Sequence, residues 1–126
     1  MSDPILDHDA LDECLRLVAA EAASYLGEVD EALVRPPQPL EAVTGIDGPL
    51  SDEGAGSLEA LRTLIDAADV AATRSAGPRF FHFVMGGGTP AALGADWLAS
   101  AFDQIAFNWV SSPLAMRLEQ ISVDWL

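Results

Sequence analysis

Four stretches of the chain carry apolar residues at the three- and four-residue spacing of an amphipathic helix, and proline- or glycine-containing segments separate them. This spacing predicts helices over about residues 9–26, 58–73, 90–106 and 113–126. The residues expected on the apolar faces are Leu11, Cys14, Leu15, Val18, Ala22, Tyr25 and Leu26, then Leu58, Leu61, Ile65 and Ala68, then Leu93, Trp97, Leu98, Ala101 and Phe102, and last Leu114, Leu118, Ile121 and Trp125. The chain is therefore expected to be mainly α.

Residues suited to helix ends flank these stretches. Short polar side chains cap helix N-termini, proline fits the first helical position, and glycine commonly follows the last. The expected end residues are Asp7 or Asp9 before the first helix and Gly27 after it, Ser57 before the second, Thr89 and Pro90 at the third, and Ser112 and Pro113 at the fourth.

Two further segments shape the expected organisation. The stretch from Arg35 to Gly56 contains several prolines and glycines, which favour extended backbone, so it is expected to lie across a neighbouring surface. The last apolar stripe is still in phase at Leu126, with no glycine cap and no basic last turn. This pattern predicts that the chain is the beginning of a longer protein.

The charge balance excludes several partners. Twenty acidic residues against six basic ones give a net charge of −14, whereas nucleic acids and anionic lipids require clustered basic residues. No apolar run reaches the roughly 18–20 residues that span a membrane. The single cysteine, Cys14, fits a small core residue in a reducing cytoplasm. A cytoplasmic protein without nucleic-acid or membrane partners is expected.

The residues alone indicate no catalytic centre. All six basic residues are arginines, so no lysine is present to act as a nucleophile or to hold a carbonyl cofactor. His8 and His82 lack neighbours at ligand spacing, so no metal site is expected. The apolar run from Phe80 to Met85 precedes three glycines, Gly86–Gly88. Glycines there could admit a ligand or form a plain turn, and both interpretations stay open.

The segment from residue 77 to 126 carries an ordered set of motifs, namely Pro78, Phe80 and Phe81, Gly86 to Gly88, Pro90 and Ala91, Ala95 and Asp96, Phe107 with Trp109, Ser112 and Pro113, Leu118 and Glu119, and Trp125 and Leu126. In this order and spacing the segment resembles the group II pyridoxal-phosphate-dependent amino-acid decarboxylases, a family that includes aromatic-amino-acid, histidine and glutamate decarboxylases. The first helix and the sequence around Arg35 are similar to the family's N-terminal arm more loosely.

The resemblance implies an α/β enzyme of the aspartate-aminotransferase fold, a homodimer that binds pyridoxal 5′-phosphate and an amino-acid substrate. Residues 1–76 would be an N-terminal helical dimerisation arm, and residues 77–126 the start of the decarboxylase domain. The substrate pocket would be lined by residues after the two phenylalanines and by two residues before the tryptophan, which reach the other subunit. By position these are Phe83, Val84, Met85, Gly86, Ile105 and Phe107. Each of the apolar ones also fits a plain core residue.

The functional hypothesis is therefore an N-terminal segment of an amino-acid decarboxylase that supplies dimer contacts and one wall of the pocket. The segment cannot catalyse alone because the lysine that holds the family's cofactor is absent. Gly77 replaces the family's usual histidine, and Gly86 replaces a polar residue of several members, which leaves the substrate undefined. The alternatives are a non-catalytic helical remnant or interaction module and, as a third option, a small-ligand binder at the glycine turn.

Overall fold

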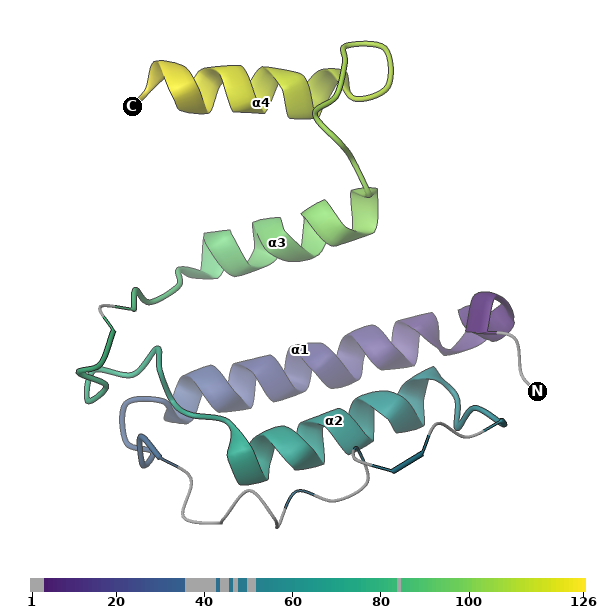
Figure 1. Cartoon of the computed structure of the whole chain (residues 1–126), viewed down its shortest axis with the longest axis vertical. Helices are drawn as coiled ribbons and strands as arrows, with labels where there is room; N and C mark the ends of the chain where they lie inside the picture. Colours follow the sequence, from purple (N-terminus) through teal and green to yellow (C-terminus); the bar gives the residue numbers. More distant parts are fainter. Residues whose placement is uncertain (1–3, 36–42, 44–45, 47, 50–51, 84) are drawn as a thin grey trace. The chain divides into compact units, whose positions relative to one another are not determined.

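The computed structural model describes residues 4–35, 43, 46, 48–49, 52–83 and 85–126. A 3₁₀ segment, η1 (Pro4–Ala10), precedes four helices: α1 (Leu11–Glu28), α2 (Ser57–Ala71), α3 (Pro90–Phe102) and α4 (Pro113–Asp124) (Figure 1). These residues contain no strand, so the expected mainly α content is confirmed for them. The chain divides into two compact units, Met1–Gly87 and Gly88–Leu126.

In the first unit, α1 and α2 lie side by side with both N-termini at the same end (Figure 1). Three contacts mark this parallel direction in order along the pair: the Ser57 amide donates to Asp7 at 2.7 Å, Arg62 lies 3.7 Å from Glu13, and the Tyr25 hydroxyl donates to the Thr73 carbonyl at 3.4 Å. At 1.5 Å per residue the 18 residues of α1 are about 27 Å long. In a parallel pair the connection between the helices must run back along this length. Residues 29–56 form that connection.

The parallel pair places two helix N-termini, with their partial positive charges, next to each other. Acidic side chains occupy the first turns at this end, with Asp12 and Glu13 in α1 and Glu59 in α2. Such side chains interact favourably with helix N-termini. These three acidic side chains therefore help to offset the adjacent partial charges of the two helix ends.

Asp7 caps α2, whereas the sequence predicted that it or Asp9 would cap α1. The N-cap residue of α1 is Ala10, with no side-chain hydrogen bond, because η1 leads directly into the helix. The N-cap residue of α2 is Gly56, so Ser57 is the first helical residue and not the cap. The Asp7 carboxylate satisfies the Ser57 amide from 50 positions away. Hydrogen bonds from the Ser57 side chain and backbone lower the pKa of Asp7 below its ordinary value.

We expect Asp7→Asn to lower the helical content of the chain near neutral pH, as measured by far-ultraviolet circular dichroism. A carboxyl whose pKa is lowered by folding stabilises the fold above its ordinary pKa and loses this effect as the pH falls through the lowered value. The difference between wild type and Asp7→Asn should therefore disappear in acid. Asp9→Asn, an exposed neighbour on the same segment, is the matched control. Equal loss in the two variants would contradict the cap.

Two other helix ends differ from the sequence prediction. Gly27 lies inside α1, because the helix continues to Glu28 and Val29 keeps right-handed backbone angles. The third helix ends at Phe102 and not near Ala106. Asp103 adopts the left-handed conformation, φ 46°, and its amide bonds the Ala99 carbonyl. Aspartate tolerates this conformation better than most residues, so it ends the helix where no glycine is present.

The second unit starts its helices at the predicted residues. The Thr89 side chain accepts a hydrogen bond from the Ala92 amide at 3.1 Å, and Pro90 is the first residue of α3. Ser112 is the buried N-cap residue of α4, although its side chain makes no capping bond. Before it, the Asn108 side chain accepts bonds from two amides, those of Val110 and Ser111.

Little apolar surface is buried among the described residues. The buried apolar residues are Cys14, Val43 and Ala67. Cys14 is thus in the core as predicted, while in α2 the buried position is Ala67 and not Ala68, which is exposed. Neither α3 nor α4 contains a buried residue. Within the second unit, much of the apolar surface of these two helices is exposed.

Candidate functional site

The segment that follows α2 folds back onto the C-terminal end of α1. The Arg74 amide donates to the Val34 carbonyl at 3.0 Å. The Arg74 guanidinium lies 4.0 Å from the centre of the Tyr25 ring, a cation–π contact with the last turns of α1. This segment leads directly to the residues that the sequence singled out as the pocket wall.

Gly77 makes the closest approach in this segment. The glycine is buried, and a Cβ atom on it would lie 2.8 Å from the Val29 carbonyl oxygen. That distance is shorter than any ordinary contact of a Cβ atom with oxygen, so a side chain would force one backbone to move. Gly77, the position where the sequence analysis noted a departure from the pattern of the similar family, thus makes a tight backbone contact.

Arg79 provides the next attachment. Its guanidinium Nη2 donates to the Asp30 carbonyl oxygen at 2.6 Å, just beyond the end of α1. The Phe80 amide donates to the Gly77 carbonyl at 3.1 Å, which closes a turn at the same place. The aromatic run therefore begins next to a residue that is bonded to the turn after α1.

The aromatic run forms a short chain of ring contacts. The ring centres of Phe80 and His82 are 5.7 Å apart at 71°, and those of His82 and Phe83 are 6.0 Å apart. Phe83 has a φ of 61°, a left-handed conformation that is unusual for an aromatic residue. Phe81 and Phe83 are each 88% exposed. Phe80 is half-buried, whereas His82 and the two other phenylalanines of the run are exposed.

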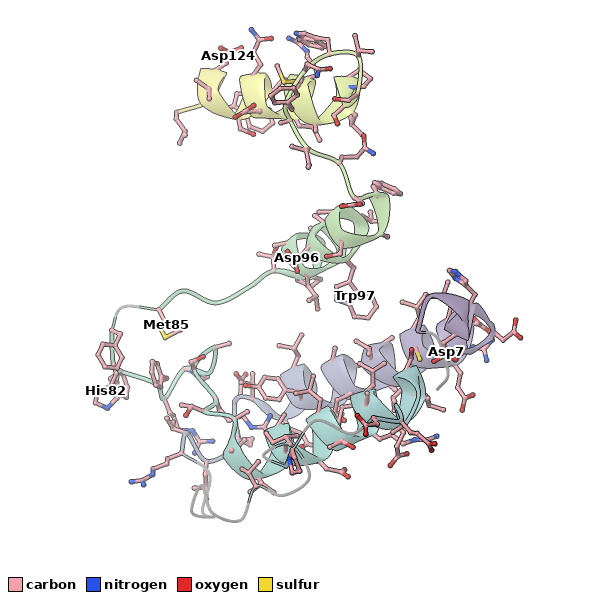
Figure 2. The ribbon with its side chains drawn as sticks, turned by 45° about the vertical axis from the view of Figure 1, so that its right-hand side comes forward. Asp7, His82, Met85, Asp96, Trp97 and Asp124 are labelled. Carbon is pink, nitrogen blue, oxygen red and sulfur yellow. The ribbon has the colours of Figure 1, made fainter. Side chains whose placement is uncertain are left out.

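The other residues of the candidate wall follow on the same loop (Figure 2). Met85 is 57% exposed, and Gly86 has open space where a Cβ would stand. Val84 lies outside the described residues. Phe83, Met85 and Gly86 thus lie close to one another in the sequence, and all three are exposed to solvent.

Ile105 and Phe107 belong to the second unit, on the turn between α3 and α4. The Phe107 amide donates to the Ile105 carbonyl at 2.7 Å, and the side chains are 71% and 80% exposed. The turn therefore presents both side chains to solvent. Their place relative to the loop of the first unit stays a prediction.

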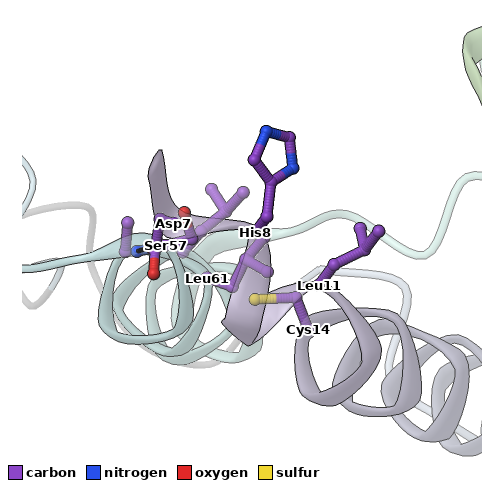
Figure 3. Close-up of a pocket in the computed structure, with 8 residues that line it drawn as sticks. Asp7, His8, Leu11, Cys14, Ser57 and Leu61 are labelled. Atoms are coloured by element: carbon purple, nitrogen blue, oxygen red, sulfur yellow. Dashed lines mark hydrogen bonds between the residues drawn. The ribbon is translucent and has the colours of Figure 1, made fainter. Parts of the chain in front are cut away.

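One hollow in each unit lies beside the helices. One of about 440 Å³ lies at the N-terminal ends of α1 and α2 (Figure 3). Its lining residues are Asp7, His8, Leu11, Cys14, Ser57, Ala60, Leu61 and Leu64. The other, about 360 Å³, lies in the second unit and is lined by Ala95, Leu98, Ala99, Phe102, Gln104, Leu114, Ala115 and Leu118. Both are mainly apolar, and the first arises from the parallel pairing that the sequence analysis missed.

The described residues offer no other chemical centre. Across the described ranges, no three His, Cys, Asp or Glu side chains gather as metal ligands would. No helix in the same part of the chain is long and apolar enough to cross a membrane. Two exposed apolar surfaces are therefore the candidates, each described by itself: the loop of Phe83 and Met85 in the first unit, and the turn of Ile105 and Phe107 in the second.

Comparison with known proteins relates the chain to plant enzymes. A tyrosine decarboxylase of Oryza sativa subsp. japonica is 32% identical over 126 aligned positions, which cover 97% of this chain and 24% of the relative. Tryptophan decarboxylase 1 of the same plant is 39% identical over 54 residues, 43% of this chain and 10% of the relative. An aromatic-L-amino-acid decarboxylase of Catharanthus roseus is 41% identical over 49 residues, 39% of this chain and 10% of the relative.

The similarity is partial in extent. The chain spans between a tenth and a quarter of the length of these relatives. No protein-family model matches the chain, and no solved structure matches it. The chain is thus similar to the aromatic-amino-acid decarboxylases. The aspartate-aminotransferase fold expected from the resemblance stays a prediction.

Proposed function

We propose that this chain is the N-terminal segment of a pyridoxal-phosphate-dependent decarboxylase that acts on an aromatic amino acid. The observation that carries the proposal is the similarity to a tyrosine decarboxylase along 97% of the chain. The ordered motifs from Pro78 to Trp125 support it, because they occur in the family's order. The proposed location is the cytoplasm, where the Cys14 thiol stays reduced.

The segment does not hold the cofactor covalently, because none of its 126 residues is a lysine. In the complete enzyme the cofactor supplies the electron sink for the loss of carbon dioxide. This chain would contribute binding and shape. Exposed aromatic side chains such as Phe83 and Phe107 would pack against the side chain of the substrate.

The second proposed role is contact with a partner subunit. The apolar faces of α3 and α4 are exposed, with Leu98 and Leu118 each at 53%, and Trp125, which follows α4, is 83% exposed. Apolar surface of this kind gains free energy when another surface covers it. In the proposed enzyme this surface would be covered by the rest of the subunit and by its partner in a homodimer.

The direct test is to purify the protein encoded by the complete reading frame and to measure bound pyridoxal phosphate and release of carbon dioxide. Tyrosine, tryptophan and DOPA are the substrates to offer, with histidine and glutamate as controls. Release from an aromatic amino acid supports the proposal. Absence of bound cofactor contradicts it.

We expect Phe107→Ala in that enzyme to raise KM for the aromatic substrate about tenfold, because an aromatic contact with the substrate ring is lost. Val110→Ala is the matched control, since Val110 is 96% exposed on the following turn. Steady-state kinetics on both variants measures the effect. Equal changes in the two variants would remove Phe107 from the pocket wall.

A non-catalytic helical interaction module is the second candidate function. The absence of lysine together with the exposed stripe of α4 favours it. It predicts that the reading frame ends without a cofactor-binding lysine and that the chain self-associates or binds another protein through Leu114, Leu118 and Ile121. Sedimentation of the purified product distinguishes a monomer from such an assembly.

A further inference from the structure

The segment between α2 and the candidate loop contacts the turn that follows α1 at several successive points. The Arg74 amide bonds the Val34 carbonyl, Gly77 packs against the Val29 carbonyl, and Arg79 bonds the Asp30 carbonyl. Within this segment Gly77 is buried and Phe80 is half-buried, whereas the side chains of Phe81 and Phe83 are each 88% exposed. Arg79, itself exposed, makes the last of these bonds before the exposed rings.

The chemistry of the Arg79 contact suits a fixed anchor. A guanidinium stays charged across the working pH range, and its hydrogen bond to a carbonyl is stronger than one between neutral groups. The acceptor, the Asp30 carbonyl, follows the C-terminal end of α1, where the helix dipole favours positive charge. The 2.6 Å contact thus joins a strong donor to an acceptor that the helix end makes more attractive.

The anchor connects directly to the aromatic rings. Phe80 follows Arg79, its amide is bonded to Gly77, and its ring begins the chain of contacts through His82 to Phe83. A fixed start limits the positions that the rings can take. Loss of the anchor would let the whole segment sample more conformations, and substrate binding would then have to order it.

We propose that Arg79 is a positioning residue for the pocket wall, acting through the Asp30 carbonyl on the described loop residues from Phe80 to Phe83. This inference rests on the proposed function for its kinetic consequence. The Arg79 hydrogen bond fixes the position of the loop residues before the substrate binds. It therefore contributes equally to the binding free energy of the substrate and of the transition state. Its removal therefore raises KM and leaves kcat nearly unchanged.

The test compares Arg79→Met with Arg79→Lys in the complete holoenzyme. The methionine side chain has similar length and no donor, and we expect KM for the aromatic substrate to rise about fivefold with kcat within about twofold. Lysine keeps a charged donor and should return KM to within about twofold of wild type. Arg16→Met is the matched control, because it removes the same charge. Arg16 pairs with Asp12 on the exposed face of α1.

A second readout is independent of catalysis. Hydrogen exchange of the amides of Gly77 and Phe80, which are bonded within the attached segment, should accelerate in Arg79→Met and recover in Arg79→Lys. Where Arg79→Met lowers the yield of folded protein, Arg79→Gln takes its place, with KM expected above that of Arg79→Lys.

The outcomes separate the two proposals. An unchanged KM together with unchanged amide exchange in Arg79→Met overturns the positioning role, as does a fall in kcat at constant KM. If the wild-type protein releases no carbon dioxide, the proposed function fails. In that case the exchange measurement alone decides whether Arg79 positions the segment, and faster exchange restored by lysine supports the anchor.

Discussion

Expressed as these 126 residues, the chain is expected to be helical yet to melt over a broad range without a cooperative transition, and to bind a hydrophobic dye. Three apolar residues are buried among those described, and Trp125, the residue that follows α4, is 83% exposed. Full burial of one large apolar side chain contributes about 1.5–3 kcal/mol. Helices that bury so few of them lack the packing from which helices in proteins gain most of their stability.

The measurement is thermal unfolding followed by far- and near-ultraviolet circular dichroism, with dye binding measured alongside. Leu118→Gln, on the exposed stripe of α4, should reduce dye binding while helical content changes little. Leu17→Gln, in the half-buried part of α1, is the comparison in which helical content should fall. A single sharp transition at the same temperature by both probes would contradict the expectation.

The existence of the helices could be predicted from the sequence because it depends on local signals. Apolar spacing and the pair Thr89 and Pro90 act within a few residues of each other, and the structure places α3 where they indicate. The direction of α1 against α2 could not be predicted. It depends on contacts such as Asp7 with Ser57, which are 50 positions apart in the sequence. The long segment between the helices was the available signal, because antiparallel neighbours need only short connections.

In the candidate site, too, local features could be predicted from the sequence and distant contacts could not. The sequence marked the run from Phe80 to Met85 as non-helical, and the structure places its described residues on a loop with exposed rings. Arg79 was missed, although an arginine beside a turn-forming glycine and proline, at the start of an aromatic run, is a visible signal. Its partner, the Asp30 carbonyl, belongs to a backbone 49 positions away, and no side-chain pattern identifies such an acceptor.

We expect Gly77→Ala to destabilise the complete protein by about 1–3 kcal/mol, the usual cost of extra volume at a closely packed position. The added Cβ would lie 2.8 Å from the Val29 carbonyl oxygen, and a second oxygen, that of Arg74, would lie at 3.3 Å. Both are backbone atoms, so neither can move aside by a change of rotamer. The turn that joins α2 to α1 would have to open, and the Arg79 anchor begins two residues later.

Urea unfolding of the complete protein measures this effect, since a free energy of unfolding is well defined only for a cooperative transition. Gly88→Ala is the matched control, because Gly88 has no atom within 4 Å of the position that a Cβ would take. It should change the free energy of unfolding by less than about 0.5 kcal/mol. Hydrogen exchange at the Arg74 amide localises the damage, since its bond to the Val34 carbonyl breaks only if this turn opens. Equal destabilisation by the two substitutions would mean that the approach of Gly77 to α1 does not hold the candidate loop in place.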